Sequence, residues 1–100
     1  MSIEGHYRKL RSTNGVNILY WNVQSLLNKI DYIVTLIEEL NINILCVCEH
    51  WLTSDELNLV KIPGFYLTDH FCRPSSGQHG GTAIFVQHVI TIKKFIDLSN

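Results

Sequence analysis

The chain has 100 residues, which limits it to one domain or part of one. Hydrophobic residues make up 46% of it and charged residues 17%, a balance that excludes a disordered polymer. The formal net charge of −1 excludes a general electrostatic attraction to nucleic acid, so any contact with DNA must come from local sites.

The first half of the chain predicts a strand, a helix and a second strand. Residues 1–15 are polar, close with an Asn-Gly turn signal and are expected to form a flexible N-terminal arm. Residues 16–22 are rich in β-branched and aromatic types and predict a buried strand. Ser25 is a suitable N-cap for the next helix, in which apolar residues recur with helical period up to Leu40. Residues 44–48 predict the second strand, so the unit is βαβ with parallel strands.

The second half of the chain predicts mostly strands. Residues 53–56 carry a capping signal for a short helix over residues 54–59. Strands are predicted over residues 65–71, 82–87 and 89–95, the last ones antiparallel, so the sheet is mixed. One long helix cannot cover both faces of such a sheet. We therefore expect an incomplete α/β fold with an exposed apolar sheet face and marginal stability.

The cysteines predict the cellular compartment. Three cysteines, Cys46, Cys48 and Cys72, are an odd number, and no apolar secretory signal precedes them. Because free thiols persist in a reducing environment, we expect a nuclear or cytoplasmic protein. The longest apolar stretches are too short to span a bilayer, which argues against a membrane partner.

Two polar residues follow the predicted parallel strands, at the edge where α/β proteins bind ligands. Asn22 ends the first strand and Glu49 follows the second. A carboxylate at the end of an apolar strand needs a partner, and Mg²⁺ completed by water and phosphate oxygens is a natural one. The structural alternatives are a turn-capping role for Asn22 and a simple ion pair for Glu49.

Five short segments occur in an informative order. They are Asn22 to Leu26 with the following Asn28-Lys29, then Cys48 to Leu52, Ile62 to Tyr66, Phe71 to Arg73, and Gly80 to Val86. Together these segments resemble the successive motifs of the endonuclease domain of non-LTR retrotransposons. That domain belongs to the endonuclease/exonuclease/phosphatase superfamily and is similar to apurinic endonucleases. The resemblance covers residues 16–87.

The resemblance implies a fold, a reaction and a set of site residues. The fold would be an incomplete part of a four-layered α/β sandwich, with residues 16–100 as the N-terminal portion of the domain. Glu49 would be a catalytic residue that ligates Mg²⁺ or Mn²⁺, and Asn22 a catalytic residue in the phosphate region. Gln24 and Arg73 would contact the substrate, DNA. The reaction would be metal-assisted hydrolysis of a phosphodiester, the nick that primes retrotransposition.

The sequence departs from the family pattern at several points. His50 stands where the family often has threonine, and Gln24 stands where apurinic endonucleases have aspartate. The later motifs of the family, a tyrosine, an Asp-x-Asn pair and a Ser-Asp-His block, do not occur in residues 1–100. We therefore expect the chain alone to lack a complete active site. A retrotransposon remnant with no selected activity is the alternative.

Other residues invite alternative interpretations. Two interpretations are open for the cysteines and histidines of the sheet: a zinc site, or buried thiols that bind no metal. The residues concerned are Cys46, Cys48, His50, His70 and Cys72. The Gly80-Gly81 pair predicts a tight turn into a strand, because no lysine-bearing phosphate loop follows it. Trp21 and Trp51 are expected to pack rather than to stack on bases. The basic residues of the N-terminal arm are expected to be solvated rather than to bind DNA.

Overall fold

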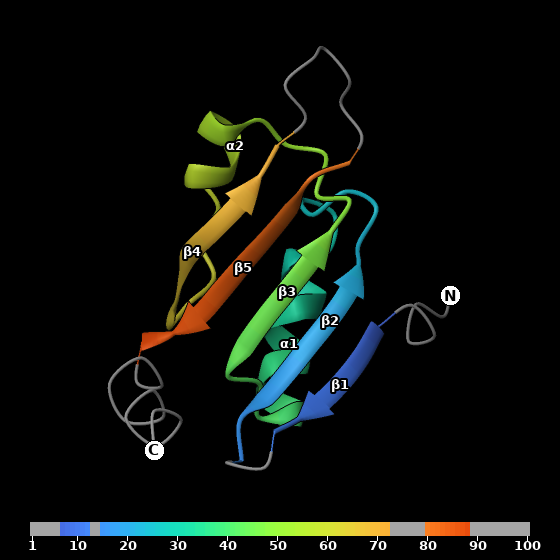
Figure 1. The fold of residues 1–100 in the computed structure, drawn as a ribbon, viewed down its shortest axis with the longest axis vertical. Coiled ribbons are helices and arrows are strands. Elements are labelled where there is room, and N and C mark those ends of the chain that lie inside the picture. Colours follow the sequence, from blue (N-terminus) through green and yellow to red (C-terminus); the bar gives the residue numbers. More distant parts are fainter. Residues whose placement is uncertain (1–6, 13–14, 73–79, 89–100) are drawn as a thin grey trace.

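A computed structural model of the chain describes residues 7–12, 15–72 and 80–88. Here the chain forms one five-stranded mixed sheet with strand order β1-β2-β3-β5-β4, accompanied by two helices (Figure 1). This confirms the predicted α/β class. The elements in chain order are β1 (Tyr7–Arg11), β2 (Asn17–Asn22), α1 (Ile30–Leu40), β3 (Ile44–Cys48), α2 (Ser54–Asn58), β4 (Phe65–Phe71) and β5 (Thr82–Gln87).

The predicted βαβ unit is formed by β2, α1 and β3. The two strands are parallel neighbours, with Leu19 opposite Leu45 and Trp21 opposite Val47. These four side chains are at most 1% exposed. Both strands are continuous runs of mostly apolar residues, as parallel strands in the middle of a sheet require. Their carboxyl ends therefore meet at one edge of the sheet.

The helix α1 begins later than the sequence predicts. It starts at Ile30, with Lys29 at the N-cap position and without a side-chain cap. Ser25 cannot be the cap, because its φ of 91° is left-handed whereas an N-cap residue is extended. Its N–H donates instead to the carbonyl of Glu49 at 2.9 Å. No helix within the described ranges is long and apolar enough to cross a membrane.

Residues 7–11 form an edge strand, where the sequence predicted a flexible arm. β1 pairs antiparallel with β2, with Tyr7 opposite Trp21. The two rings pack edge-on, with centroids 5.9 Å apart. The prediction was wrong for this segment because its polar composition does not indicate that it pairs with β2. An edge strand can carry exposed charged side chains and still satisfy the backbone groups of its neighbour.

The second half of the sheet follows the sequence closely. The predicted short helix is α2, and its capping box is complete. Thr53 Oγ1 accepts from the N–H of Glu56, and the Glu56 carboxylate accepts from the N–H of Thr53. β5 pairs antiparallel with β4, as predicted, and it also pairs antiparallel with β3, which was not predicted. The strand predicted over residues 89–95 lies outside the described residues.

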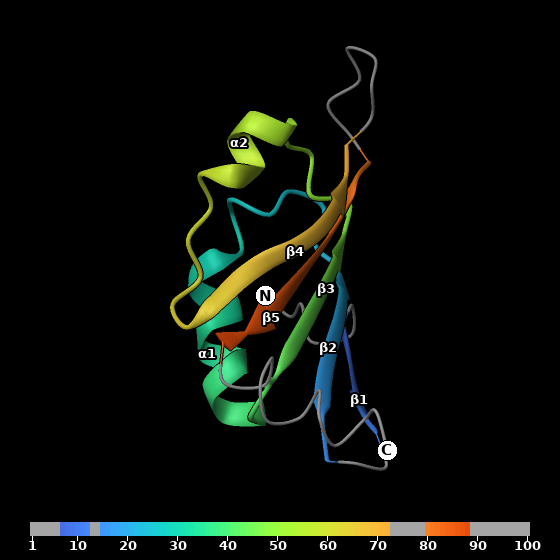
Figure 2. The same ribbon diagram turned by 60° about the vertical axis from the view of Figure 1, so that its left-hand side comes forward.

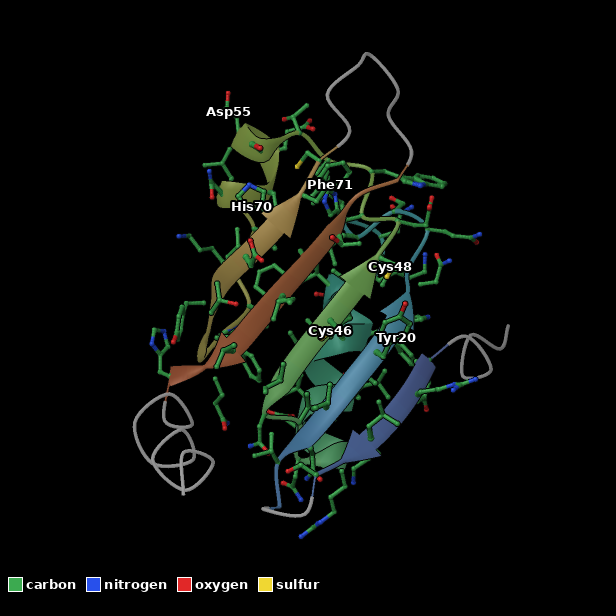
Figure 3. The ribbon with its side chains drawn as sticks, viewed as in Figure 1. Tyr20, Cys46, Cys48, Asp55, His70 and Phe71 are labelled. Atoms are coloured by element: carbon green, nitrogen blue, oxygen red, sulfur yellow. The ribbon has the colours of Figure 1, made fainter. Side chains whose placement is uncertain are left out.

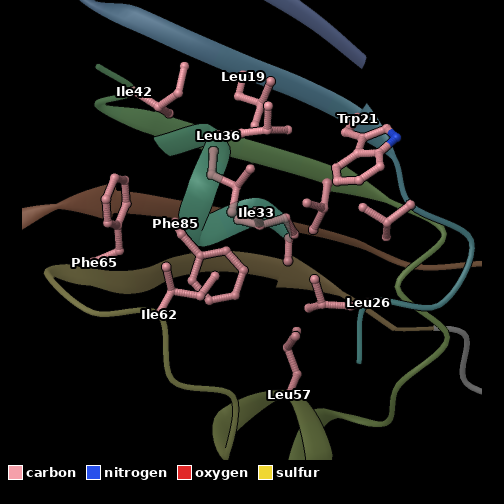
Figure 4. Packing of buried hydrophobic residues seen from close by; sticks show 14 residues of the cluster. Leu19, Trp21, Leu26, Ile33, Leu36, Ile42, Leu57, Ile62, Phe65 and Phe85 are labelled. Atoms are coloured by element: carbon pink, nitrogen blue, oxygen red, sulfur yellow. The ribbon is translucent and has the colours of Figure 1, made fainter. Parts of the chain in front are cut away.

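The hydrophobic core lies between the sheet and the two helices, which cover the same face (Figure 2). Ile33 and Leu36 of α1 and Leu57 of α2 are at most 3% exposed. They face sheet residues such as Trp21 and Phe85 (Figure 4). Burying side chains of this kind contributes about 1.5–3 kcal/mol each, so this one-sided core holds the helices on the sheet.

The opposite face of the sheet carries no helix in the part of the chain that the structure describes (Figure 2). Its exposed side chains alternate with the buried ones along the strands. Leu10 is 49% exposed and Ile84 is 36% exposed. The predicted exposed apolar face is therefore present. One aliphatic or aromatic row crosses all five strands and consists of Leu10, Ile18, Ile44, Val86 and Tyr66.

Candidate functional site

The loops that follow β2 and β3 lie side by side at the carboxyl ends of these strands. The N–H of Val23 donates to the carbonyl of Cys48, and that of Ser25 to the carbonyl of Glu49, both at 2.9 Å. Asn22 lies opposite Cys48 in the register, and Glu49 follows directly. The structure thus brings Asn22 and Glu49 to one edge of the sheet, as the sequence predicted.

A third segment, Gly80-Gly81, lies against the loop after β3. The carbonyl of Gly81 accepts from the N–H of Glu49 at 2.7 Å, and that of Gly80 from the N–H of Trp51 at 3.1 Å. The φ angles of the glycines are 93° and 91°. A Cβ at Gly81 would lie 2.4 Å from ring atoms of His50. Glycine is therefore required at position 81 both for its backbone conformation and for space, as the turn prediction anticipated.

Four residues of the two loops hold strained backbone conformations. The φ angle is 48° at Gln24, 91° at Ser25, 60° at Glu49 and 63° at Trp51. A left-handed conformation costs a residue with a side chain about 1–2 kcal/mol. Among the other described residues that are not glycine, this feature occurs at Asn41, a helix C-cap where asparagine tolerates it. Such a concentration of strain is typical of functional sites.

The carboxylate of Glu49 is half-buried and is oriented by two N–H donors. Its Oε1 accepts a hydrogen bond from the indole Nε1 of Trp51 at 2.9 Å. The same oxygen accepts from the backbone N–H of Gly80 at 3.2 Å. Neither donor carries a charge, so neither neutralises the carboxylate. The carboxyl edge of the sheet therefore holds a carboxylate with a defined orientation.

His50 lies between these charged and strained residues but has a structural role. Its side chain is fully buried. Nδ1 accepts from the backbone N–H of Leu52 at 2.9 Å and therefore carries no proton. Nε2 consequently carries the proton and donates to the carbonyl of Phe71 at 3.0 Å. This neutral imidazole connects the loop after β3 to the end of β4.

The residues of the alternative zinc interpretation do not form one cluster, although Cys72 Sγ lies 3.8 Å from His50 Nε2. Cys46 and Cys48 lie on the uncovered face, and Cys48 Sγ donates to Tyr20 Oη at 3.2 Å (Figure 3). Hydrogen bonding with Cys48 and the electrostatic interaction with it raise the pKa of Tyr20. Burial raises the pKa of Cys46. His50 is buried away from Cys46 and Cys48, and no group of three His, Cys, Asp or Glu side chains within the described ranges could hold a metal.

Comparison with protein-family models matches residues 19–100 to the endonuclease/exonuclease/phosphatase family. The chain belongs to this family. The matched segment begins in β2 and contains both loops of the site and the Gly80-Gly81 pair. A comparison with the curated proteins gives no match. Members of the endonuclease/exonuclease/phosphatase family are hydrolases of the nuclease or phosphatase type and generally use divalent metal ions.

The donor set of the site fits a hard divalent cation of the kind this family uses. Glu49 offers one carboxylate with a fixed orientation. Asn22 offers an exposed amide at the end of the neighbouring strand. One or two carboxylates, completed by water and phosphate oxygens, are a common protein contribution to a magnesium site. A zinc site needs three or four protein ligands, which these residues do not supply.

The remaining predicted residues have mixed outcomes. Gln24 is exposed in the loop after β2, and its contact with substrate stays a prediction. Arg73 lies outside the described residues. Trp21 is a core residue, as predicted. Trp51 was expected to pack, and its hydrogen bond with Glu49 was missed. The only signal for that bond was a separation of two residues, which predicts nothing unless the backbone turn is known.

Proposed function

We propose that this chain is the N-terminal part of a Mg²⁺- or Mn²⁺-dependent DNA endonuclease of the retrotransposon type. The observation that carries the proposal is the Glu49 carboxylate, oriented by two neutral donors at the carboxyl edge of the sheet. Asn22 at the end of the adjacent strand supports it. The order of the five sequence segments favours this branch of the family over small-molecule phosphatases.

The chemistry follows from the residues at this edge. Glu49 ligates the cation, which when bound stabilises negative charge on the phosphate oxygens in the transition state. Asn22 has an amide that can donate a hydrogen bond to a phosphate oxygen. Gln24 and Arg73 contact the DNA backbone and orient the strand. Because the net charge of −1 provides no general attraction to DNA, binding depends on these local contacts. The protein would encounter its DNA in the nucleus or the cytoplasm.

The proposal includes inactivity of the 100 residues by themselves. The general base and its orienting partner belong to family motifs that these residues do not contain. The test is nicking of supercoiled plasmid by the chain in Mg²⁺, with Glu49→Ala and chelated metal as controls. We expect no nicking above the Glu49→Ala background. Nicking that Glu49→Ala abolishes would contradict the inactivity but support the metal role of Glu49.

A second experiment separates a nuclease from a remnant with no selected activity. The remnant is the second candidate, because the described part of the sheet exposes apolar side chains such as Leu10 and Ile84. Sequencing the transcript and locus beyond codon 100 discriminates the two. In-frame Asp-x-Asn and Ser-Asp-His motifs are the result expected for a nuclease. A disrupted frame would overturn the nuclease proposal in favour of the remnant.

A further inference from the structure

We propose that Trp51 is a positioning residue that holds the Glu49 carboxylate ready for a divalent cation. This inference deepens the proposed function and rests on it. Trp51 does not ligate the cation in this proposal. It acts through Glu49, by a hydrogen bond from its indole Nε1 to Oε1 at 2.9 Å.

The backbone conformation of the loop makes this contact possible. Glu49 and Trp51 are separated by one residue, and both are left-handed, with φ angles of 60° and 63°. The N–H of Glu49 is fixed by Gly81 and the N–H of Trp51 by Gly80. The loop therefore curls on the glycine pair, so that the indole reaches back to the carboxylate.

The strain in the loop is evidence that these two side chains matter. Glycine at either position would relieve the left-handed conformation at no steric cost. It would also remove either the carboxylate or its indole donor. The chain keeps a side chain at both positions, although the backbone conformation there favours glycine.

The chemistry of the donor suits a carboxylate that must bind a cation. An indole N–H is a donor without charge, so it fixes the carboxylate without competing with a cation for its negative charge. Lysine or arginine in the same place would neutralise it. Partners of this kind behind a metal ligand commonly improve metal affinity about 10- to 100-fold. Trp51 therefore has the properties of such a partner.

The experiment titrates Mn²⁺ into the ¹⁵N-labelled chain and follows paramagnetic broadening of backbone amide signals in residues 49–52 and 80–81. Trp51→Phe keeps an aromatic ring and removes the N–H donor. We expect its dissociation constant for Mn²⁺ to rise at least about tenfold. Tyr66→Phe, a polar-atom deletion on an aromatic ring of β4, is the matched control and should leave the constant unchanged.

A second readout addresses the hydrogen bond without metal. The chain has two tryptophans, so its spectrum holds two indole N–H signals. Glu49→Gln keeps an acceptor oxygen and should leave the Trp51 indole signal protected from solvent exchange. Glu49→Ala removes the acceptor and should accelerate that exchange. Equal exchange in the two variants would show that Glu49 does not accept the indole hydrogen bond, which would overturn the role of Trp51.

The outcomes separate the two claims. Equal Mn²⁺ affinity of Trp51→Phe and the unchanged chain would overturn the role of Trp51 and leave the metal role of Glu49 intact. Unaltered Mn²⁺ binding by Glu49→Ala would overturn the proposed function, and this inference with it. Weaker binding by Trp51→Phe with abolished binding by Glu49→Ala would support both.

Discussion

The parallel strands β2 and β3 have polar residues at both ends, but the two ends are built in different ways. At the amino end, neutral amides join the strands. The N–H of Asn17 donates to Asn43 Oδ1, and Asn43 Nδ2 donates to Gln87 Oε1, each at 2.9 Å. At the carboxyl end, the charged Glu49 sits among left-handed residues. At the amino end the amide N–H donors have ordinary hydrogen bonds, and Asn17 Oδ1 is a buried acceptor without a partner among the described residues. The carboxyl end instead combines a carboxylate with strained backbone.

This difference shows how a structural polar cluster can be told from a functional one. The amide cluster stabilises the fold through its N–H donors, which bond to neutral carbonyl oxygens. The carboxyl end adds a cost, because a left-handed conformation costs each of its non-glycine residues about 1–2 kcal/mol. A fold retains such a costly arrangement where a side chain is needed for another purpose. The predictions that follow test whether the two ends differ in this way.

The largest expected effect is at the carboxyl end, in Gly81→Ala. Its Cβ would meet the buried His50 ring, and its φ of 91° disfavours any side chain. We expect a loss of about 2–5 kcal/mol in the free energy of unfolding, from strain and overpacking together. Gly64→Ala is the matched control, since its φ is 82° but its Cβ would meet nothing within 4 Å. It should lose only about 1–2 kcal/mol. Equal losses in urea denaturation would show that the His50 contact contributes nothing.

The next largest effect is at the amino end, in Asn43→Ala. The substitution removes the acceptor for the N–H of Asn17 and the donor to Gln87. Leaving a partly buried backbone donor without its partner should cost about 1–3 kcal/mol. Asn58→Ala, at an exposed position in α2, should change stability by less than about 0.5 kcal/mol. If urea denaturation gave both variants the same stability, the amide cluster would not be stabilising.

The same contrast explains which parts of the molecule could be predicted from sequence. The strands over residues 17–22 and 44–48 and the short helix α2 follow from local patterns of apolar and capping residues. The position of Glu49 at the sheet edge follows from the βαβ order alone. These features depend on residues that are near one another in the chain.

The features that were missed depend on contacts between distant segments. Ser25 was expected to cap α1, but its N–H bonds to Glu49 in the loop after the next strand. The indole of Trp51 reaches Glu49 because Gly80 and Gly81 shape the loop from about 30 residues further along the chain. No local pattern contains this information. The place of Asn22 and Glu49 at the sheet edge was therefore predicted, their functional roles stay a prediction, and the supporting contacts of the candidate site were not predicted.

A smaller effect of opposite sign is expected at the carboxyl end, in Ser25→Gly. Glycine adopts the φ of 91° at this position without the steric strain that serine has there. After the entropic cost of glycine is subtracted, the free energy of unfolding should rise by about 1 kcal/mol. Asn41→Gly relieves a φ of 54° at the amino end, where asparagine is already tolerated. It should change stability by less than about 0.5 kcal/mol. A loss of stability in Ser25→Gly would argue against stored strain in this loop.

The smallest effect concerns Cys46, midway between the two ends and on the uncovered face. Because burial raises the pKa of Cys46, the unfolded chain ionises this thiol at a lower pH than the folded chain does. The contribution of the neutral thiol to stability is therefore fully present below the ordinary thiol pKa of about 8.5. It decreases as the pH rises above that value.

The measurement is the free energy of unfolding at about pH 7 and about pH 9.5, on either side of the ordinary thiol pKa. The unchanged chain should lose more stability over this interval than Cys46→Ala, which has no thiol to ionise. Cys72→Ala retains Cys46 and should lose as much as the unchanged chain. An identical loss in Cys46→Ala would mean that the thiol is as well solvated in the fold as in the unfolded chain.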